Sequence, residues 1–251
     1  MRLKGRVAII TGGSQGIGEA FARRFAAEGA SVAIVNRDQS KAAAVVDSIR
    51  SSGGEALAVQ ADVARVGDID AAVAQVVAAY GTVHILLNNA GVYLMSPLGG
   101  TTEEAFDTMV AANLKGVFFL CQQVLPVFER QGGGKIINIG SIFGHDGYPG
   151  SAVYCGTKAA IALLTKSLAL ELRDRNIQVN AIAPGWIETP MNEHARNTDT
   201  QYLRAIDERF GGPGGWMKPD ELTGSAVFLA SPDADSVTGT VLFVDRGWSA
   251  Y

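Results

Sequence analysis

TGGSQGIG, at residues 11–18, sets the architecture that this chain can adopt. An apolar run at residues 7–11 leads into it, and an amphipathic pattern at residues 17–28 follows. A glycine-rich turn between a strand and a helix is typical of a dinucleotide site, because glycine permits a tight turn and lets the backbone approach a pyrophosphate. The start of the helix adds free N–H groups and a partial positive charge for the phosphates. This context favours a nucleotide site over a plain glycine-rich connector.

The rest of the chain alternates between short apolar runs and longer amphipathic patterns. Seven runs are apolar on both faces, as strands covered by helices on two sides should be, at residues 7–11, 31–36, 55–61, 84–89, 135–140, 177–183 and 240–245. Helices are predicted between them at residues 17–28, 40–51, 69–79, 103–128, 152–173 and 221–230. This alternation predicts an α/β fold, a single Rossmann-type doubly wound domain. We expect a seven-stranded parallel sheet of order 3-2-1-4-5-6-7 with helices on both faces.

Length and composition fit one globular domain. The chain has 251 residues, of which 47% are apolar and 18% charged, so residues 1–251 are expected to form one dinucleotide-binding domain. Residues 191–219 are polar and glycine-rich, with a possible short helix at residues 200–209, and are expected to form a substrate flap within that domain. The net charge is −4 and no run of lysines and arginines stands out, so the sequence does not predict nucleic-acid binding.

Other features bear on location and metal binding. Cys121 and Cys155 are too few for a disulfide framework, which favours a reduced, cytoplasmic protein. The start of the chain has only a short apolar run, so no membrane association and no secretory signal are expected. His84, His145 and His194 lack metal-ligand spacing, so no metal site is predicted.

A second motif, YCGTK, follows the fifth predicted strand. Tyr154 and Lys158 are four residues apart on a predicted helix, so they share one face. An ammonium group beside a phenol favours the phenolate and lowers the pKa of the phenol. Tyr154 is therefore predicted to exchange protons near neutral pH, which a lone tyrosine does poorly. A pair of exposed surface residues is the alternative interpretation, but the position at the carboxyl end of a strand favours the site.

Six pieces in one order resemble the short-chain dehydrogenase/reductase family over nearly the whole chain. They are TGGSQGIG, NNAG ending at Gly91, Asn113, Ser141, YCGTK, and PGWIETPM beginning at Pro184. The resemblance implies that Tyr154 is the acid in carbonyl reduction and the base in alcohol oxidation. It also implies roles for three partners: Lys158 lowers the pKa of Tyr154 and binds the nicotinamide ribose, Ser141 holds the substrate oxygen, and Asn113 anchors a water that links Lys158 to solvent.

The same motifs imply the residues that bind the cofactor. The resemblance places Asp62 and Val63 beside the adenine, Ile187 and Thr189 on the carboxamide, and Pro184 and Gly185 in the turn before them. Small residues at the end of the fourth strand would let the backbone approach the ribose. The full predicted set is Gly12, Ser14, Gln15, Gly16, Ile17, Gly18, Asn36, Arg37, Asp62, Val63, Asn89, Ala90, Gly91, Tyr154, Lys158, Pro184, Gly185, Ile187 and Thr189.

The end of the second strand decides between NADP and NAD. An acidic residue there binds the ribose 2′-hydroxyl of NAD, whereas a nearby arginine accommodates the 2′-phosphate of NADP. Asn36 stands where the acid is expected, Arg37 follows it, and Lys41 is near. NADP is therefore favoured. NAD is the alternative, because Asp38 can turn toward the ribose and Ser14 and Gln15 offer no basic partner.

The residues expected around the substrate are mostly apolar and aromatic, which suits a neutral ketone or secondary alcohol of modest size. His145 is the exception: it can hydrogen-bond a second substrate oxygen or be a structural histidine. The predicted substrate residues are Ser141, Phe143, His145, Tyr148, Trp186 and Met191, with Tyr93, Leu94, Ile142, Trp216 and Met217 as further candidates. Arg246 departs from the family's pattern, which has glycine there.

The sequence also bears on the oligomeric state and leaves alternative functions open. The long apolar helices resemble the family's four-helix interfaces, which implies a homotetramer. Two enzyme alternatives are reduction of 3-oxoacyl groups on a carrier protein and NAD-dependent oxidation of a sugar or polyol. Arg130, Arg173 and Arg175 would give the carrier protein a weak basic contact. A nucleotide-sensing binding protein is the alternative from another class, although it would not need Tyr154, Lys158, Ser141 and Asn113 together.

Overall fold

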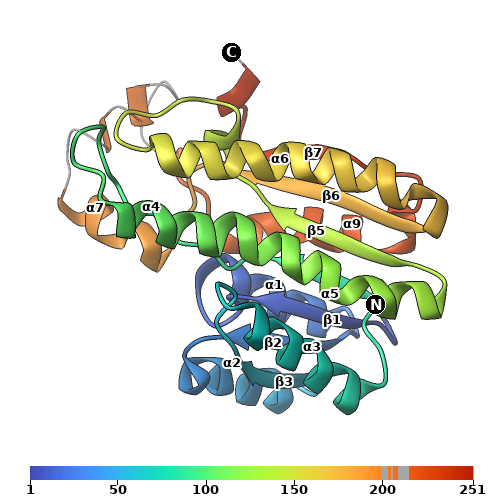
Figure 1. Ribbon diagram of the computed structural model, residues 1–251. Helices are drawn as coiled ribbons and strands as arrows, with labels where there is room; N and C mark the ends of the chain where they lie inside the picture. Colours follow the sequence, from blue (N-terminus) through green and yellow to red (C-terminus); the bar gives the residue numbers. More distant parts are fainter. Residues whose placement is uncertain (199–202, 205, 209–214, 251) are drawn as a thin grey trace.

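The computed structural model describes residues 1–198, 203, 204, 206–208 and 215–250. Within these residues the chain forms a seven-stranded sheet of order β3-β2-β1-β4-β5-β6-β7, as predicted (Figure 1). All neighbouring strands pair in parallel. The strands are β1 (Val7–Thr11), β2 (Ser31–Asn36), β3 (Glu55–Gln60), β4 (Ile85–Asn88), β5 (Gly134–Ile139), β6 (Ile177–Pro184) and β7 (Val241–Val244). The order reverses between β1 and β4, so a crevice opens at the carboxyl ends of these strands.

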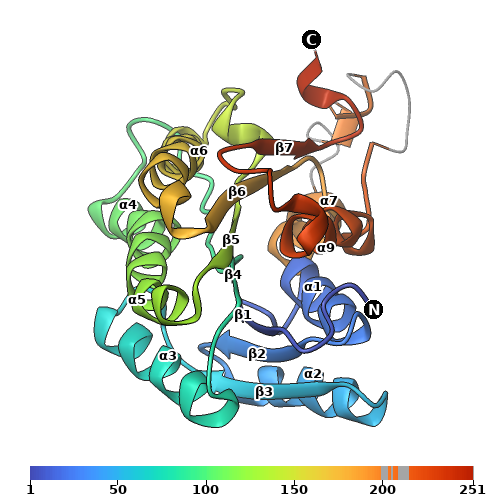
Figure 2. The ribbon, with the colours of Figure 1, turned by 90° about the vertical axis from the view of Figure 1, so that its right-hand side faces the viewer.

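Helices cover both faces of the sheet. Figure 2 shows α1 (Gly16–Ala27), α2 (Gln39–Ser51) and α9 (Thr223–Ala230) on one face. The other face carries α3 (Val66–Tyr80), α5 (Gly116–Gln131) and α6 (Ala152–Leu172). Every residue of β1 and β6 is buried, which explains why the strands are apolar on both faces.

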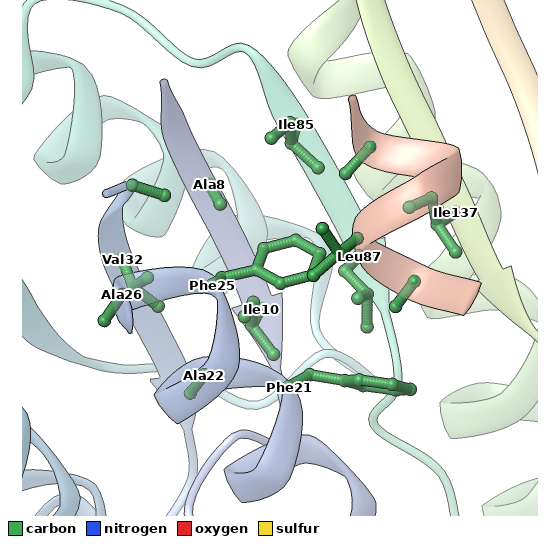
Figure 3. Close-up of a cluster of buried hydrophobic side chains, with 14 of the residues drawn as sticks. Ala8, Ile10, Phe21, Ala22, Phe25, Ala26, Val32, Ile85, Leu87 and Ile137 are labelled. Carbon is green, nitrogen blue, oxygen red and sulfur yellow. The ribbon is translucent and has the colours of Figure 1, made fainter. Parts of the chain in front are cut away.

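Alternate residues of one strand feed two separate cores. Ala8 and Ile10 belong to the cluster under α1, whereas Val7 and Ile9 belong to the cluster under α3 and α5. Figure 3 shows the first cluster, in which Phe21 and Phe25 of α1 lie over β1 and β4. This packing fixes α1 against the sheet and so positions the glycine-rich turn that precedes it.

The predicted helix at residues 103–128 contains an irregularity. It is α4 (Glu103–Val110), a π-helical turn η1 (Ala111–Lys115) and then α5. π-helical turns are rare and often mark functional sites, and Asn113 stands at the centre of this one. The apolar pattern runs through it without a break, so periodicity gives no sign of it.

The predicted flap is partly described. It begins with η4 (Pro190–Asn192) and α7 (Glu193–Thr198), and it ends at η5 (Pro219–Leu222), which precedes α9. Residues 203, 204 and 206–208 are helical; the rest of the predicted helix at 200–209 falls outside the described residues. Backbone hydrogen bonds tie the end of the flap to the segment after β6: Met217 N donates to Trp186 O at 2.8 Å, and Glu188 N donates to Met217 O at 2.9 Å.

Candidate active site

A cleft of about 700 Å³ lies at the carboxyl ends of the strands. Every residue predicted to bind the cofactor lines it, from Gly12 after β1 to Thr189 after β6. These residues come from turns that are far apart in sequence, and the parallel sheet brings them to one edge.

The glycine-rich turn is shaped to admit a ligand. Gly12 and Gly16 have φ angles of 65° and 55°, a region that favours glycine. A Cβ on Gly18 would collide with the carbonyl oxygen of Gly12 and lie 2.5 Å from Asn89 Nδ2. Gln15 caps α1 without a side-chain hydrogen bond, so the first N–H groups of α1 face the cleft side of the turn and are available to phosphate oxygens. The turn therefore fits a dinucleotide.

Asn89 supports this turn as well as lining the cleft. Its Nδ2 donates to Thr11 O at 3.0 Å and to Gly12 O at 3.2 Å. The hydroxyl of Thr11 accepts from the backbone N–H groups of Asn89 and Ala90 at 3.1 and 3.0 Å. The two loops that follow β1 and β4 are thus held together at the point where the strand order reverses.

At the end of β2, Asp38 is committed to its own helix. Its carboxylate accepts from Ser40 Oγ at 2.7 Å and from Lys41 N at 3.2 Å, as the N-cap of α2. Those hydrogen bonds hold the pKa of Asp38 below its ordinary value. Asn36 Nδ2 donates to Asp38 O at 2.9 Å. Arg37 is exposed and lines the cleft beside Lys41.

Tyr154 and Lys158 lie on the first turns of α6 and face the cleft. Lys158 Nζ is 5.6 Å from the centre of the Tyr154 ring and donates to Ile139 O at 2.8 Å. Lys158 is 6% exposed, and burial lowers the pKa of its ammonium group to about 8. The spacing in YCGTK correctly placed both side chains on one helix face.

The predicted lowering of the Tyr154 pKa is wrong for the protein alone. Burial raises the pKa of the Tyr154 phenol, and a hydrogen bond with Ser141 opposes this only in part. Desolvation disfavours the phenolate and also weakens the charge on Lys158, so the cation gives less help than the sequence suggests. The phenol is therefore protonated at neutral pH and is a proton donor.

Ser141 lies beside the phenol at the end of β5. It is the N-cap of the 3-10 turn η2 (Ile142–Gly144), and its Oγ accepts from Phe143 N at 3.1 Å. This bond fixes the hydroxyl oxygen in the turn, while its hydrogen is free to point at Tyr154 or at a substrate oxygen.

Asn113 is a structural link in this structure. Its Oδ1 accepts from Val92 N at 2.8 Å, and its Nδ2 donates to Val92 O at 2.9 Å and to Thr157 Oγ1 at 3.3 Å. Asn113 is 1% exposed and does not line the cleft in the described part of the chain. Its amide holds the loop after β4 against the start of α6, and the predicted role for a water at Asn113 stays a prediction.

The predicted substrate residues divide into two groups. Phe143, Trp186 and Met191 line the cleft together with Ser141. His145 and Tyr148 do not line it. The His145 side chain is 60% exposed and its Nδ1 lies 2.8 Å from Asp146 Oδ1, whereas Tyr148 stacks on the far side of Phe143, with ring centres 4.7 Å apart.

Of the further candidates, Tyr93 and Ile142 line the cleft, and Leu94, Trp216 and Met217 do not. One wall was not predicted: Asp107, Thr108, Ala111 and Ala112, from α4 and η1. These residues precede Asn113 by one to six positions, and that proximity was the signal available in the sequence. Among the described residues, no group of three or more His, Cys, Asp and Glu side chains is arranged to hold a metal ion.

Comparisons with known proteins agree with this geometry. A family profile described as short chain dehydrogenase matches residues 6–200. A 3beta-hydroxysteroid dehydrogenase 1 from Eggerthella lenta is 41% identical over 251 residues, which cover 99% of this chain and 95% of that protein. Two crystal structures are similar along almost their full length. A gluconate 5-dehydrogenase from Burkholderia cenocepacia in complex with NADP and tartrate has a TM-score of 0.94 and 37% identity, covering 100% and 97% of the two chains. A 3-ketoacyl-(acyl-carrier-protein) reductase from Brucella melitensis complexed with NADH has a TM-score of 0.88 and 38% identity, covering 98% and 99%.

Proposed function

The chain belongs to the short-chain dehydrogenase family, and we propose that it moves a hydride between NADP and a ketone or secondary alcohol with Tyr154 as the acid and base. It is an NAD(P)-dependent oxidoreductase of carbonyl and alcohol groups. One observation carries the assignment of Tyr154: its phenol, the hydroxyl of Ser141 and the ammonium of Lys158 lie together on the wall of the cleft.

The bound dinucleotide supplies or accepts the hydride. The residues of the chain manage the oxygen and the proton. Ser141 hydrogen-bonds the substrate oxygen, and Tyr154, whose phenol is protonated at neutral pH, donates its proton to that oxygen as the carbonyl is reduced. Lys158, held by Ile139 O, stabilises the negative charge that remains on the Tyr154 oxygen. In alcohol oxidation the same groups act in the opposite order.

The preference for NADP rests on the end of β2. Asp38 Oδ1 caps α2 through two hydrogen bonds, so turning this side chain away from its helix toward a ribose would break them. Arg37 is exposed on the cleft, and its guanidinium suits a 2′-phosphate. Lys41 adds a second positive charge, only loosely paired with Asp38 at 3.9 Å.

A panel of ketones and alcohols with both cofactors, followed by the absorbance of the reduced nicotinamide, tests this function. The wild type should have the higher kcat/KM with NADP. Arg37→Ala should lower that value by roughly ten- to a hundred-fold, the size of a lost charge-assisted contact, and should change the value with NAD much less. Arg65→Ala removes an exposed arginine that does not line the cleft and is the matched control. A large NAD preference that Arg37→Ala leaves unaltered contradicts the assignment of NADP.

Reduction of groups on a carrier protein is less well supported. Arg173 and Arg175 lie in η3 (Arg173–Arg175), beyond the far end of α6 from Tyr154. Because α6 has 21 residues, these arginines are about 30 Å from the cleft. Arg175 is also paired with Glu129, at 2.7 Å, and Arg130 is at the same far end, in the last turn of α5. The three arginines are thus remote from the mouth of the cleft.

A further inference from the structure

The C-terminal segment, residues 245–250, is a feature that the cofactor and the proton chemistry leave unexplained. It follows β7 and ends in the turn η7 (Trp248–Ala250). Asp245 shapes it, because its carboxylate accepts from Gly247 N at 3.0 Å and from Ser249 N at 2.9 Å. The segment thus has a defined conformation and is fixed to the end of β7.

Trp248 joins this segment to the loop that precedes α6. Its indole Nε1 donates to Asp146 Oδ2 at 3.0 Å, and the ring is 5% exposed. Asp146 follows directly on the turn that carries Ser141 and Phe143 (Figure 1 shows the red C-terminal turn near this loop). The bond therefore links the last residues of the chain to the loop beside the phenol of Tyr154.

Trp248 also supports the cleft wall. The ring centres of Trp248 and Trp186 are 5.4 Å apart in an edge-to-face contact. Trp186 in turn contacts Phe143, at 5.4 Å between ring centres, and Phe143 contacts the Tyr154 ring at 6.3 Å. Trp186 and Phe143 line the cleft and are 6% and 8% exposed, so their positions are set by packing.

Arg246 makes a third link. It has a φ of 54°, a conformation that favours glycine, and its Nη2 donates to Glu221 Oε2 at 2.8 Å. Glu221 also accepts from Lys218 N at 2.8 Å through its other oxygen, at the end of the flap. Both side chains of the ion pair are about two-fifths exposed, so the pair adds little stability, but it joins the C-terminal segment to the end of the flap.

Two polar side chains that line the cleft, Tyr93 and Asn192, are already engaged in hydrogen bonds. The Tyr93 hydroxyl is 2.9 Å from Ser151 Oγ. Asn192 Nδ2 donates to Ile187 O at 2.7 Å, and its Oδ1 accepts from Thr189 N at 3.1 Å. The rings of Phe143 and Trp186 offer mostly carbon surface, so a substrate hydroxyl turned against them would lose its water, which costs about 1–3 kcal/mol if it stays unpaired.

We propose that Trp248 holds an aromatic wall, formed by Phe143 and Trp186, that recognises the hydrocarbon ring of a cyclic ketone or cyclic secondary alcohol placed beside Tyr154. This rests on the proposed function. A rigid ring buries apolar surface on a fixed wall and loses little conformational freedom, whereas a polyhydroxylated chain loses both hydration and freedom. Trp248 is a positioning residue, because it acts through Trp186.

Steady-state kinetics with decalone, a bicyclic ketone, and with erythrulose, a polyhydroxylated ketone that stays open-chain in water, test the proposal. The wild type should turn over decalone with a kcat/KM at least about a hundred-fold higher. Trp248→Phe keeps a ring and removes the bond to Asp146; it should raise the KM for decalone roughly ten-fold, with a smaller effect on kcat. Asp146→Ala should raise the KM for decalone by a similar factor. The double variant should have a KM no higher than either single variant, because both substitutions remove the same hydrogen bond.

Two controls separate positioning from general damage. The Kd for the cofactor should be the same in all variants, and Tyr80→Phe, which removes a hydroxyl from a half-buried ring at the end of α3, should leave the ratio of the two substrates unchanged. A preference for erythrulose, or equal losses on both ketones in Trp248→Phe, overturns the proposal and leaves the proposed function standing. If the wild type binds cofactor but turns over no ketone or alcohol, both are overturned.

Discussion

Tyr154 and Lys158 are two ionisable side chains buried in one cleft, and burial moves both away from the charged form. The pKa of Lys158 falls to about 8, and the pKa of Tyr154 rises. At neutral pH the lysine still carries its proton most of the time, and the tyrosine carries its own. The unliganded protein is therefore poised as a proton donor, the state that carbonyl reduction requires.

Tyr154→Phe tests the role of the phenol directly. The variant keeps the ring that contacts Tyr93 and Phe143 and loses only the hydroxyl group. We expect kcat to fall by at least about 10²-fold, the usual contribution of a positioned acid or base. Stopped assays of ketone reduction give kcat, and fluorescence titration gives the cofactor Kd, which should not change. Near-normal turnover in this variant would refute the assignment.

Lys158 should also affect the pH dependence of stability. Its pKa is about 8 in the folded chain and 10.5 in the unfolded chain, so between these values the unfolded state binds more protons. Stability then rises with pH. Between about pH 7 and pH 9.5, the free energy of unfolding of the wild type should rise by roughly 2 kcal/mol more than that of Lys158→Met. Urea unfolding of both proteins at each pH measures the difference, and a difference that stays constant contradicts a buried, titrating lysine.

At the scale of single residues, the sequence predicted which side chains lie together, but it did not predict the direction in which the pKa of Tyr154 moves. The four-residue spacing places Tyr154 and Lys158 on one face, because helix geometry is local. The direction of the Tyr154 shift depends on how much water the folded chain removes, which is a property of packing. The bonds between Asn113 and Val92 escaped prediction for the same reason, since they join a helix to a loop far away in the sequence.

Among the elements, the turn from β1 into α1 is the most constrained. Gly18 lies in the first turn of α1, and Gly67 lies in the first turn of α3. A Cβ on Gly18 would collide with the Gly12 carbonyl, whereas a Cβ on Gly67 meets nothing within 4 Å. Two glycines in the first turns of their helices therefore have opposite steric constraints.

Alanine at these two positions should separate packing from helix propensity. Gly18→Ala must displace the backbone at Gly12 and should destabilise the fold or weaken cofactor binding at least about ten-fold. Gly67→Ala should be neutral or stabilise the protein by up to about 1 kcal/mol, because alanine favours the helix. Thermal unfolding and cofactor titration of the pair measure both effects. Equal behaviour of the two variants contradicts the close approach.

Helices and strands were predicted correctly where the apolar residues followed one regular repeat along the whole element. The buried strands were found because they are short and apolar on both faces, and the order of the sheet follows from right-handed crossovers. The π-helical turn at Ala111–Lys115 was not found, because one extra residue in a helical turn leaves the apolar pattern nearly unchanged. Its cause is tertiary: Asn113 is held by the loop after β4.

At the scale of the molecule, the described residues leave a broad face of α5 and α6 exposed. By length and apolar composition alone, the helical segments Glu103–Gln131 and Ala152–Arg175 of the described chain could each cross a membrane, yet only 39% and 28% of their most apolar windows are buried. α5 and α6 lie side by side against the sheet (Figures 1 and 2). Phe118, Leu163 and Leu170 are 40%, 69% and 68% exposed on these helices. An exposed apolar surface of this kind is typical of an interface.

We propose that this face joins copies of the chain into a homotetramer. A charge at the centre of such an interface would be buried without a partner. Leu163→Glu combined with Leu170→Glu should therefore convert the tetramer to smaller species in light scattering coupled to size exclusion. Leu98→Glu is the matched control, because Leu98 is 99% exposed and lies on the loop after β4, outside α5 and α6. A wild type that elutes as a monomer, or a double variant that remains a tetramer, contradicts the proposal, since an interface elsewhere would not respond to charges on α6.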